Sequence, residues 1–566
     1  MSSGYFFSSR EDVSITREQD QSLADSMGHI LNGDVLFFSK EWKPLGLGYD
    51  WVTNPQTGYR YDIYQHWTEI QSLSREAGDI KFVWEKSRFS WLLTVCRYDY
   101  HFGEDHSEFV IGQILDWIDK NPLNCGPNYV CSQEISIRLN NWVFALHFYK
   151  RSKALTQERF QRIMDSLYGQ ICHVYSNINY SRISVRNNHA ITETLTLYIM
   201  GLLFPMMPNA SKWKANGKRW FEKEIAYQIE EDGTYLQDSM NYHRVVIQLL
   251  TYAIALADAN NEKFEDTVYE RAYKSLNFLY QCQEPSNGWL PNYGSNDGAL
   301  FFPLSNADYR DYRPQMDALH ALLTGKPLYD KYLEDAQWIG HSASSARTAF
   351  PEIKKKYGLV EFRKSGFYLI REKDTLTFIR CGLFKSNGST DQLHMDVWYK
   401  GENLLMDGGS FMYNTDESTV RYFAGTESHN TVMLGDYDQM QKGPRFMWFF
   451  PPTVISAELK EEDSYYEFNG KICAFKHVTA GGVVISRSVR KLKDRPEWVV
   501  TDSFEGVPPH IVRRQLWHTD FELQFGSDAE RIDGEGWTSD YYGVKRNIRQ
   551  VEFQTNNNMI ITTLKF

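Results

Sequence analysis

The sequence predicts two domains, an N-terminal α/α toroid followed by a C-terminal antiparallel β-sandwich. At 566 residues the chain is too long for a single hydrophobic core. Apolar residues recur at helical spacing from about residue 69 to 323, whereas short alternating runs prevail after about residue 357. We therefore expect the toroid over residues 1–345 and the sandwich over residues 346–566.

The helical half contains periodic apolar stretches separated by short Gly, Pro or Asn punctuation. The clearest helices are expected at 109–118, 135–149, 160–175, 191–203, 245–256 and 268–282. Each helical hairpin must bury an apolar stripe, and closing the hairpins into a ring satisfies all the stripes at once. A straight solenoid is the alternative, but no fixed internal period supports it.

Between His341 and Tyr357 the helical periodicity is lost and small, Pro and basic residues accumulate, which indicates a domain boundary. Strands are expected beyond it at 366–371, 375–380, 483–489 and 498–502. A region of this size, about 210 residues, suits a large two-sheet antiparallel sandwich better than a small barrel.

The composition constrains the partners. The net charge of −11 means that the long-range field does not attract polyanions, so an anionic substrate requires a local basic patch. Nucleic acid is not expected, because no Lys/Arg run or nucleic-acid motif occurs. Aromatic residues make up 15% of the chain, and each ring either packs in a core or lines a groove where sugars stack.

The seven cysteines are scattered and none forms a C-x-x-C pair; only Cys125 and Cys131, which flank a turn-like Gly-Pro-Asn, could form a disulfide. No stretch approaches the roughly 20 apolar residues of a membrane span. The N-terminal residues lack the basic-then-apolar layout of a signal peptide. We therefore expect no membrane span.

Two polar clusters precede helices in the first half. Arg186-Asn187-Asn188-His189 comes directly before an amphipathic run, where an Asn is a common N-cap and a His is commonly partly buried. The segment DGTYLQDSMNYH, which ends in Tyr242 and His243, comes before the apolar run from residue 245. Tyr242 is either a packed ring or a reactive phenol.

The two clusters together suggest a chemistry, because helices of one toroid can direct their starts into the same cleft. Proton removal next to a uronate carboxylate requires donors for that carboxylate, a base, and an acid for the departing oxygen. Asn188 supplies amide donors, His189 a base or donor, and Tyr242 a proton for the leaving oxygen. A Tyr that also acts as base needs its pKa lowered, which Arg186 or a nearby imidazolium would do.

A third constellation lies in the β half. In the motif DQLHMDVW, His394, Asp396 and Trp398 share one face of a strand, and Asp407 and His429 follow in later motifs. These His and Asp residues could bind a divalent metal, although no compact motif such as H-E-x-x-H is present. The alternative is a polar network that braces the domain interface.

The motifs NNHAITE, DGTYLQDSMNYH, DQLHMDVWYKGENLLMDGG and ESHNTV occur in this order and resemble those of the heparinase II/III-like polysaccharide lyases, over roughly residues 60 to 480. The resemblance implies an incomplete α/α toroid paired with a β-sandwich, and β-elimination of heparan sulfate, hyaluronan, chondroitin or alginate to 4,5-unsaturated uronates. It also implies that Asn188 neutralises the carboxylate, that His189 is the adjacent catalytic His, and that Tyr242 is the acid/base Tyr.

Several proteins of this family hold a structural zinc through a His upstream of the position of Asp391, an Asp matching Asp407 and a His matching His429. Ser389 and Asn387 stand where the first His is expected. We therefore expect no metal and no cofactor, with Asp407 and His429 as the remaining ligand candidates.

The D-x-L-H-x-D-x-W form of the β-domain motif is most similar to that of hyaluronan and chondroitin lyases such as polysaccharide lyase family 33, and heparan sulfate and alginate stay open. An acidic polysaccharide is the expected partner. The resemblance also implies a periplasmic or secreted bacterial protein. The residues expected to contact the substrate are Arg186, His243, His394, His429, Arg421 and Tyr422.

Two other function classes compete. A glycoside hydrolase on an α/α toroid would need two carboxylates that face each other across the scissile bond, for which Asp232, Asp238 and Asp297 are the candidates. A non-catalytic glycan-binding protein would keep the aromatic and basic residues without needing the Asn-His-Tyr set.

Overall fold

The computed structural model describes residues 4–72, 74–340, 350–383, 390–444 and 447–566. Contacts divide the chain into two compact units, here called the helical unit (1–228, 244–273 and 299–352) and the β unit (229–243, 274–298 and 353–566). The expected boundary at residue 345 lies outside the described residues. Two segments from the first half of the chain therefore group with the β unit.

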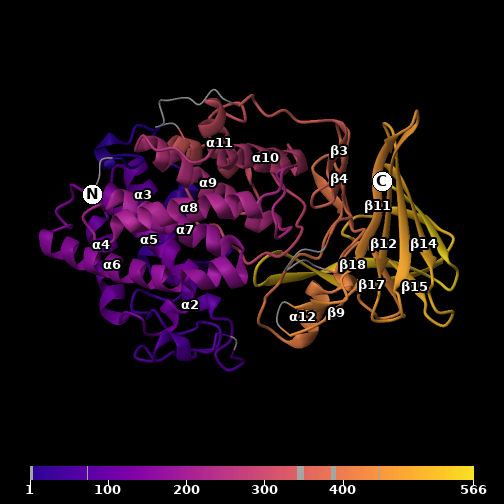
Figure 1. The fold of residues 1–566 in the computed structure, drawn as a ribbon, viewed down its shortest axis with the longest axis horizontal. Helices are drawn as coiled ribbons and strands as arrows, with labels where there is room; N and C mark the ends of the chain where they lie inside the picture. Colours follow the sequence, from indigo (N-terminus) through magenta and orange to yellow (C-terminus); the bar gives the residue numbers. More distant parts are fainter. Residues whose placement is uncertain (1–3, 73, 341–349, 384–389, 445–446) are drawn as a thin grey trace. The chain divides into compact units, whose positions relative to one another are not determined.

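The first half of the chain is built mainly from helices, coloured indigo to magenta in Figure 1. Their bounds are α1 Gln21–Leu31, α2 Lys81–Ser87, α3 Trp91–Phe102, α4 Ser107–Lys120, α5 Ser132–Phe148, α6 Gln157–Asn179, α7 Asn188–Leu203, α8 Ala210–Gln228, α9 Met240–Ala259, α10 Asp266–Cys282 and α11 Arg313–Thr324. A short hairpin of β1 (Asp34–Phe37) and β2 (Glu41–Pro44) follows α1. All six expected helices are confirmed, within α4, α5, α6, α7, α9 and α10.

Helix α7 is enclosed by its neighbours. It packs against α5, α6 and α8, and nearly all of its residues are buried. Two glycines allow the closest approach to α8, because a Cβ on Gly217 would lie 2.4 Å from the backbone N of Tyr198 and one on Gly201 would lie 2.4 Å from the backbone O of Ala210. The packing of the surrounding helices therefore fixes the position of α7.

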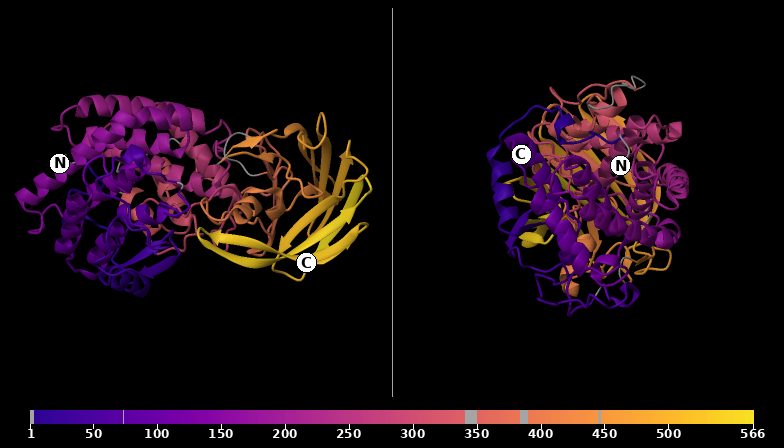
Figure 2. Two further views of the ribbon diagram at one scale, coloured as in Figure 1. Left: turned by 90° about the horizontal axis from the view of Figure 1, so that it is seen from below. Right: turned by 90° about the vertical axis from the view of Figure 1, so that its left-hand side faces the viewer.

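The second half of the chain forms antiparallel sheets, coloured orange to yellow in Figures 1 and 2. Three larger sheets have the strand orders β3-β4-β5-β6-β7, β11-β12-β13-β14-β19-β16 and β17-β18-β15-β8. The bounds are β3 Gly358–Phe362, β4 Phe367–Arg371, β5 Thr375–Arg380, β6 Met395–Tyr399, β7 Glu402–Leu405, β8 Val432–Leu434, β11 Thr453–Glu461, β12 Tyr465–Ala474, β13 Val483–Leu492, β14 Glu497–Glu505, β15 Arg513–Thr519, β16 Gln524–Ser527, β17 Glu530–Tyr541, β18 Val544–Thr555 and β19 Met559–Lys565. The four expected strands are confirmed as β4, β5, β13 and β14.

The three sheets contribute to one hydrophobic core. Ile379 of β5, Val489 of β13, Trp498 of β14 and Val551 of β18 belong to the same buried cluster. Residues of β13 and β14 alternate between buried and more exposed, as expected for strands with one face on a core. The predicted fold class, an incomplete α/α toroid followed by an antiparallel β-sandwich, is confirmed.

Two smaller expectations concern membranes and disulfides. Within the part of the chain that the structure describes, no helix is long and apolar enough to cross a bilayer. Cys125 and Cys131 are both free thiols, so the disulfide considered for them does not form.

An ion pair lies inside the β unit. The Arg487 guanidinium donates to both carboxylate oxygens of Asp502 at 2.8 and 2.7 Å, and it also donates to the carbonyl oxygens of Leu393 and Asn430. Both charged side chains are fully buried. The guanidinium therefore links β13 and β14 to two loops that carry candidate site residues.

We expect Asp502→Ala to lower the free energy of unfolding by about 3–5 kcal/mol, because it leaves the Arg487 charge buried without its partner. Arg531→Gln, which breaks an exposed ion pair with Asp533, is the matched control and should change it by less than about 1 kcal/mol. Denaturant unfolding followed by circular dichroism measures both. Equal losses in the two variants would contradict the role given to the buried pair.

Candidate functional site

The start of α7 carries the first expected site. Asn187 is the N-cap, since its side-chain oxygen accepts a hydrogen bond from the His189 N–H at 3.0 Å. The Gln228 amide of α8 donates to the Asn187 carbonyl oxygen at 2.9 Å. Asn187 therefore has the capping role considered for it, and Asn188 and His189 are the first two residues of the helix.

Helix α5 positions the same turn from the other side. The Gln133 amide donates to the Thr192 hydroxyl at 3.1 Å, and that hydroxyl donates to the Asn188 carbonyl oxygen at 2.8 Å. The Cys131 sulfur lies 3.8 Å from Nδ1 of His189. Burial raises the pKa of Cys131 to about 12, so the group facing the imidazole is a neutral thiol. Nδ1 of His189 therefore faces the Cys131 thiol.

One turn further along α7, Glu193 is a buried acid. Its carboxylate accepts a hydrogen bond from the Ser181 hydroxyl at 2.6 Å. Burial raises its pKa to about 8, and the hydrogen bond from Ser181 opposes that rise only in part. At neutral pH the side chain is therefore mostly protonated.

The segment that leads into Tyr242 is anchored within the β unit. The Arg380 guanidinium of β5 forms a buried ion pair with Asp238 at 2.9 Å. The Met240 N–H donates to the Tyr293 carbonyl oxygen at 3.1 Å. The Ser239 hydroxyl oxygen accepts from the Tyr242 N–H at 3.1 Å and so caps the first turn of α9. Tyr242 thus lies in the first turn of α9, and that turn is held by contacts within the β unit.

The Tyr242 phenol is buried and pairs with a second phenol, since its oxygen lies 2.8 Å from the Tyr413 hydroxyl oxygen. Burial, together with Asp297 and Tyr413, raises the pKa of Tyr242 well above its usual range. We had expected Arg186 or an imidazolium to lower this pKa. The structure shows the reverse, because burial and acidic neighbours favour the neutral phenol.

The expected meeting of Tyr242 with Asn188 and His189 stays a prediction, because these residues are described in different units. Tyr242 is held by contacts within the β unit, and the Asn188-His189 pair is held by contacts within the helical unit. The phenol is protonated and suited to donate, and the Asn-His pair is held at a helix start.

His243 does not have the open position that contact with a substrate requires. Its ring is buried and stacked on Phe278 at 5.3 Å, and its Nε2 is hydrogen-bonded to the Ser275 hydroxyl. Burial lowers its pKa to about 3, so the ring is neutral. A packing role in the β unit explains these contacts better than the expected contact with a glycan.

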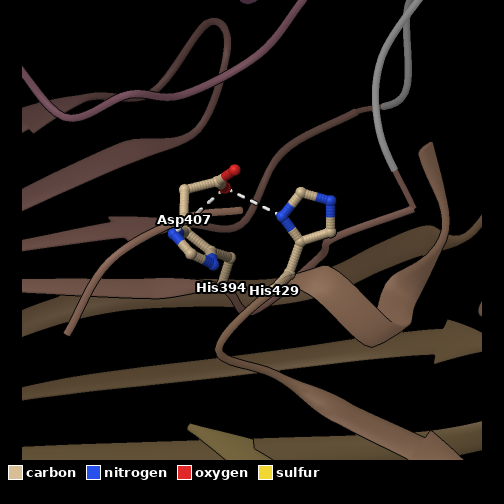
Figure 3. A group of neighbouring side chains, drawn as sticks. All are labelled: His394, Asp407 and His429. Atoms are coloured by element: carbon tan, nitrogen blue, oxygen red, sulfur yellow. Dashed lines mark hydrogen bonds and ion pairs between the residues drawn. The ribbon is translucent and has the colours of Figure 1, made fainter. Parts of the chain in front are cut away.

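His394, Asp407 and His429 form a buried cluster in the β unit, shown in Figure 3. Nδ1 of His429 lies 2.8 Å from Oδ2 of Asp407, and Nε2 of His394 lies 3.5 Å from the same oxygen. Nδ1 of His394 accepts the Asn430 N–H at 3.1 Å. We had expected His394 and His429 to reach a substrate, but both rings are enclosed around Asp407.

The cluster fits a divalent cation. One atom from each side chain lies within 4.8 Å of the others, and two imidazoles with one carboxylate are ligands that zinc accepts. Nε2 of each His is buried with no hydrogen-bond partner among the described residues. The reason for expecting no metal, that only two of three ligands remained, does not hold because His394 supplies the third. A cation here would balance the buried carboxylate and tie together the loops around it.

Of the two residues before the HNT motif that were expected to contact the substrate, Arg421 is exposed and Tyr422 is half-buried. Arg421, on α12 (Glu417–Ala424), is exposed and donates to the Asp436 carbonyl oxygen at 3.3 Å. The Tyr422 hydroxyl is bonded to the backbone of Trp537, accepting from its N–H at 2.8 Å. Substrate contact by these two residues stays a prediction, and Arg421 is the better placed for it.

Sequence reasoning misassigned one member of these sites and missed another. It named His394 among the residues that could bind a metal, but it then assigned His394 to the substrate, because it searched for the third ligand only upstream of Asp391. It did not consider Tyr413 at all, since a Tyr among many aromatic residues gives no local signal. A search for every His near Asp407 in the chain could have found the former.

We expect an equimolar amount of Zn²⁺ to raise the thermal unfolding midpoint of the protein by several degrees, because a ligand that binds only the folded state stabilises it. Asp407→Asn should abolish the rise, and His510→Ala, at an exposed position outside the cluster, should leave it intact. Differential scanning calorimetry with and without a chelator measures the effect. An unchanged midpoint for the unsubstituted protein would refute the metal assignment.

Stability should also fall with rising pH because of Glu193. Its pKa is about 8 in the folded protein against 4.5 in the unfolded chain, so between these values the folded state binds a proton that the unfolded state lacks. The contribution of this proton to the free energy of unfolding is therefore complete below about pH 4.5. It falls as the pH rises towards 8, by up to about 1.4 kcal/mol per pH unit. Glu193→Gln should gain stability relative to the unsubstituted protein as pH rises from 5 to 8.

Thermal unfolding midpoints across this pH range provide the measurement. Glu158→Gln, at an exposed position, serves as the control and should give a curve parallel to that of the unsubstituted protein. A parallel curve for Glu193→Gln as well would show that Glu193 is not a buried acid.

The chain is similar to curated proteins and to solved structures. It is 23% identical over 453 residues to a heparin-sulfate lyase of Bacteroides thetaiotaomicron, a match that spans 74% of this chain and 58% of the relative. It is 21% identical over 516 residues to a heparin-sulfate lyase of Bacteroides stercoris, a match that spans 84% of this chain and 73% of the relative. The chain thus spans less than two thirds of the first relative's length.

Among solved structures, a heparinase III crystal structure matches with a TM-score of 0.68 at 16% identity, over 98% of this chain and 86% of that one. A second heparinase III structure matches with a TM-score of 0.62 at 17% identity, over 98% of this chain and 85% of that one. At these identities the likeness concerns the fold alone.

Two family models match the sequence. The model described as "Heparinase II/III N-terminus" matches residues 12–301, and the one described as "Heparinase II/III-like, C-terminal" matches residues 354–562. The resemblance seen in the four motifs is confirmed, whereas the preference for the hyaluronan and chondroitin branch is not supported. The chain belongs to the heparinase II/III-like family.

Proposed function

We propose that this protein is a polysaccharide lyase that cleaves heparan sulfate by β-elimination. Membership of the heparinase II/III-like family supports the reaction class, and the names of the curated relatives, all heparin-sulfate lyases, support the substrate. Heparan sulfate, first held as an alternative, therefore replaces hyaluronan or chondroitin as the proposed substrate. We also propose a periplasmic or secreted location, on the same resemblance.

The observation that carries the proposal is the neutral, hydrogen-bonded phenol of Tyr242 at a capped helix start. In the proposed reaction a base takes the proton from C5 of the uronate, the C5–H electron pair forms the C4–C5 double bond, and the C4–O bond breaks. A proton must reach the departing oxygen. A phenol that keeps its proton at neutral pH is suited to supply it.

Asn188 and His189 have the complementary roles. The amide of Asn188 donates to the uronate carboxylate, so that negative charge developing next to it costs less. His189 either donates to the same carboxylate or removes the C5 proton. The Cys131 thiol faces Nδ1 of this imidazole at 3.8 Å and so helps to orient the ring.

The hydrolase reading has less support. Asp238 is ion-paired with Arg380, and the Asp232 carboxylate accepts from the Thr234 and Lys364 N–H groups at 3.2 and 2.8 Å. Carboxylates committed to such partners are poor candidates for the facing acid and base that a glycosidase requires.

Incubation with heparan sulfate, hyaluronan, chondroitin sulfate and alginate, with ultraviolet absorbance following the new double bond, tests the proposal. We expect heparan sulfate to give the fastest rise and Tyr242→Phe to lower that rate at least about 100-fold, because the variant has no acidic proton to give. Tyr235→Phe, which also removes a buried hydroxyl from this segment, is the matched control and should keep most of the activity.

Other outcomes contradict the proposal in distinct ways. A saturated product would indicate hydrolysis, and binding without any product would indicate a non-catalytic protein. Faster cleavage of hyaluronan or chondroitin sulfate would overturn the proposed substrate but leave the reaction class.

A further inference from the structure

A basic and aromatic surface lies beside the start of α7 in the helical unit. It is formed by the end of α6, the helical turn η4 (Tyr180–Val185) with the residue that follows it, and α8. We call it the arginine strip, and its members are Arg182, Arg186, Arg219, Tyr175, Trp220 and Tyr227. None of these residues except Arg186 had been singled out by motif.

The arginines are stacked on the aromatic rings. The guanidinium carbon of Arg182 lies 3.9 Å from the ring centroid of Trp220, and that of Arg186 lies 3.4 Å from the ring centroid of Tyr227. Arg219 lies further out, at 5.9 Å from Trp220. A stacked guanidinium keeps its planar set of donors while losing little additional freedom when it binds an anion.

The strip has more positive charge than its acidic neighbours balance. Arg186 has a carboxylate partner, Glu224 at 3.4 Å, whereas Arg182 and Arg219 donate to amide oxygens, of Asn179 at 3.4 Å and Asn216 at 3.1 Å. Nε of Arg182 and Nε of Arg186 are buried with no hydrogen-bond partner among the described residues. Among the described residues, neither Arg182 nor Arg219 forms an ion pair with a carboxylate, so their charge can pair with an incoming anion.

Two exposed arginines on α6, the helix that carries Tyr175, are paired with carboxylates, unlike Arg182 and Arg219. On α6, Arg159 forms a two-pronged pair with Glu108, and Arg162 pairs with Asp119. In a chain with a net charge of −11, a cluster of arginines that shares so little acidic charge is a local exception. It is the kind of basic patch that an acidic protein requires to hold a polyanion.

The strip adjoins the proposed catalytic residues along the chain. Arg186 immediately precedes the Asn187 cap and adopts a left-handed conformation with φ of 45°, which a non-glycine residue rarely does. Its N–H donates to the Ser181 carbonyl oxygen at 2.7 Å. On α8, Trp220 and Tyr227 are two turns apart on one face, or about 10 Å along the helix axis. The arginine strip therefore runs from Arg186, next to the start of α7, along α8 to Trp220.

We propose that the arginine strip is a glycan-binding subsite, which holds sulfate and carboxylate groups of the same chain whose uronate is cleaved at Asn188 and His189. The proposal rests on the proposed function and adds the residues that select a highly charged substrate. Guanidinium groups match the geometry of sulfate and carboxylate oxygens, and the aromatic rings offer faces for sugar stacking.

Binding of heparan sulfate oligosaccharides of graded length tests the subsite. The measurements use isothermal titration calorimetry at several salt concentrations, with Tyr242→Phe as the background so that the ligand stays intact. Adding Arg182→Gln or Arg219→Gln should each weaken the binding of long oligosaccharides about tenfold, because each removes charge-assisted hydrogen bonds to an anion. The salt dependence should become shallower, since fewer counterions are released on binding.

Arg162→Gln is the matched control on α6, because its guanidinium is already paired with Asp119, and it should leave affinity unchanged. Arg219 is exposed, so its substitution tests the strip even if the loss of the Arg182 stack destabilises the fold. Unchanged affinity and salt dependence in both strip variants would overturn the proposal. An equal loss of affinity for inorganic polyphosphate would overturn the assignment to a glycan.

Failure of the subsite and failure of the proposed function are distinguishable. If the unsubstituted protein yields unsaturated product from heparan sulfate while both strip variants bind it normally, the subsite is wrong and the lyase stands. If no glycan is cleaved but heparan sulfate binds through Arg182 and Arg219, the lyase is wrong and the subsite stands.

Discussion

The enclosure of α7 by α5, α6 and α8 is the constraint on which the helical part of the candidate site depends. A buried helix start leaves backbone N–H groups that must find partners, because an unpaired buried donor is costly. Asn187 accepts from the His189 N–H. Gln228 and Thr192 donate to the carbonyl oxygens of Asn187 and Asn188, and Gln133 of α5 donates to the Thr192 hydroxyl. The same contacts leave Asn188 and His189 with little freedom, so their orientation is a consequence of packing.

The β unit orders its own contribution by charge pairing rather than by helix packing. Arg380 holds Asp238 just before α9, and Arg487 ties Asp502 to the loops of Leu393 and Asn430. Both guanidiniums are buried, so each must be nearly fully satisfied by partners in the fold. Buried arginine–aspartate ion pairs therefore fix both the segment with Tyr242 and the loops around the His-Asp-His cluster.

Protonation at these sites follows from burial. Glu193 and Tyr242 both have raised pKa values because their surroundings disfavour negative charge, whereas Asp407 has a lowered pKa because His429 and His394 outweigh the effect of burial. A protonated phenol, a neutral acid and a stabilised carboxylate thus coexist in one chain. The exposed face of η4 and α8 shows the complementary pattern, with cations gathered on aromatic rings where solvent remains available.

Local periodicity was sufficient to predict six of the helices, four of the strands and the change from helices to strands beyond residue 357, because each depends on side-chain spacing along a short segment. The polar starts of α7 and α9 were also evident in the sequence, as was the family to which their motifs belong. The tertiary structure alone decided that His394 joins Asp407 and His429, that Tyr242 pairs with Tyr413, and that Arg182 and Arg219 share Trp220. Except for Arg219 and Trp220, which are neighbours on α8, the members of these groups lie far apart in the sequence. The protonation of the buried members also depends on their burial. Neither the pairing nor the burial is encoded in the spacing of any one segment.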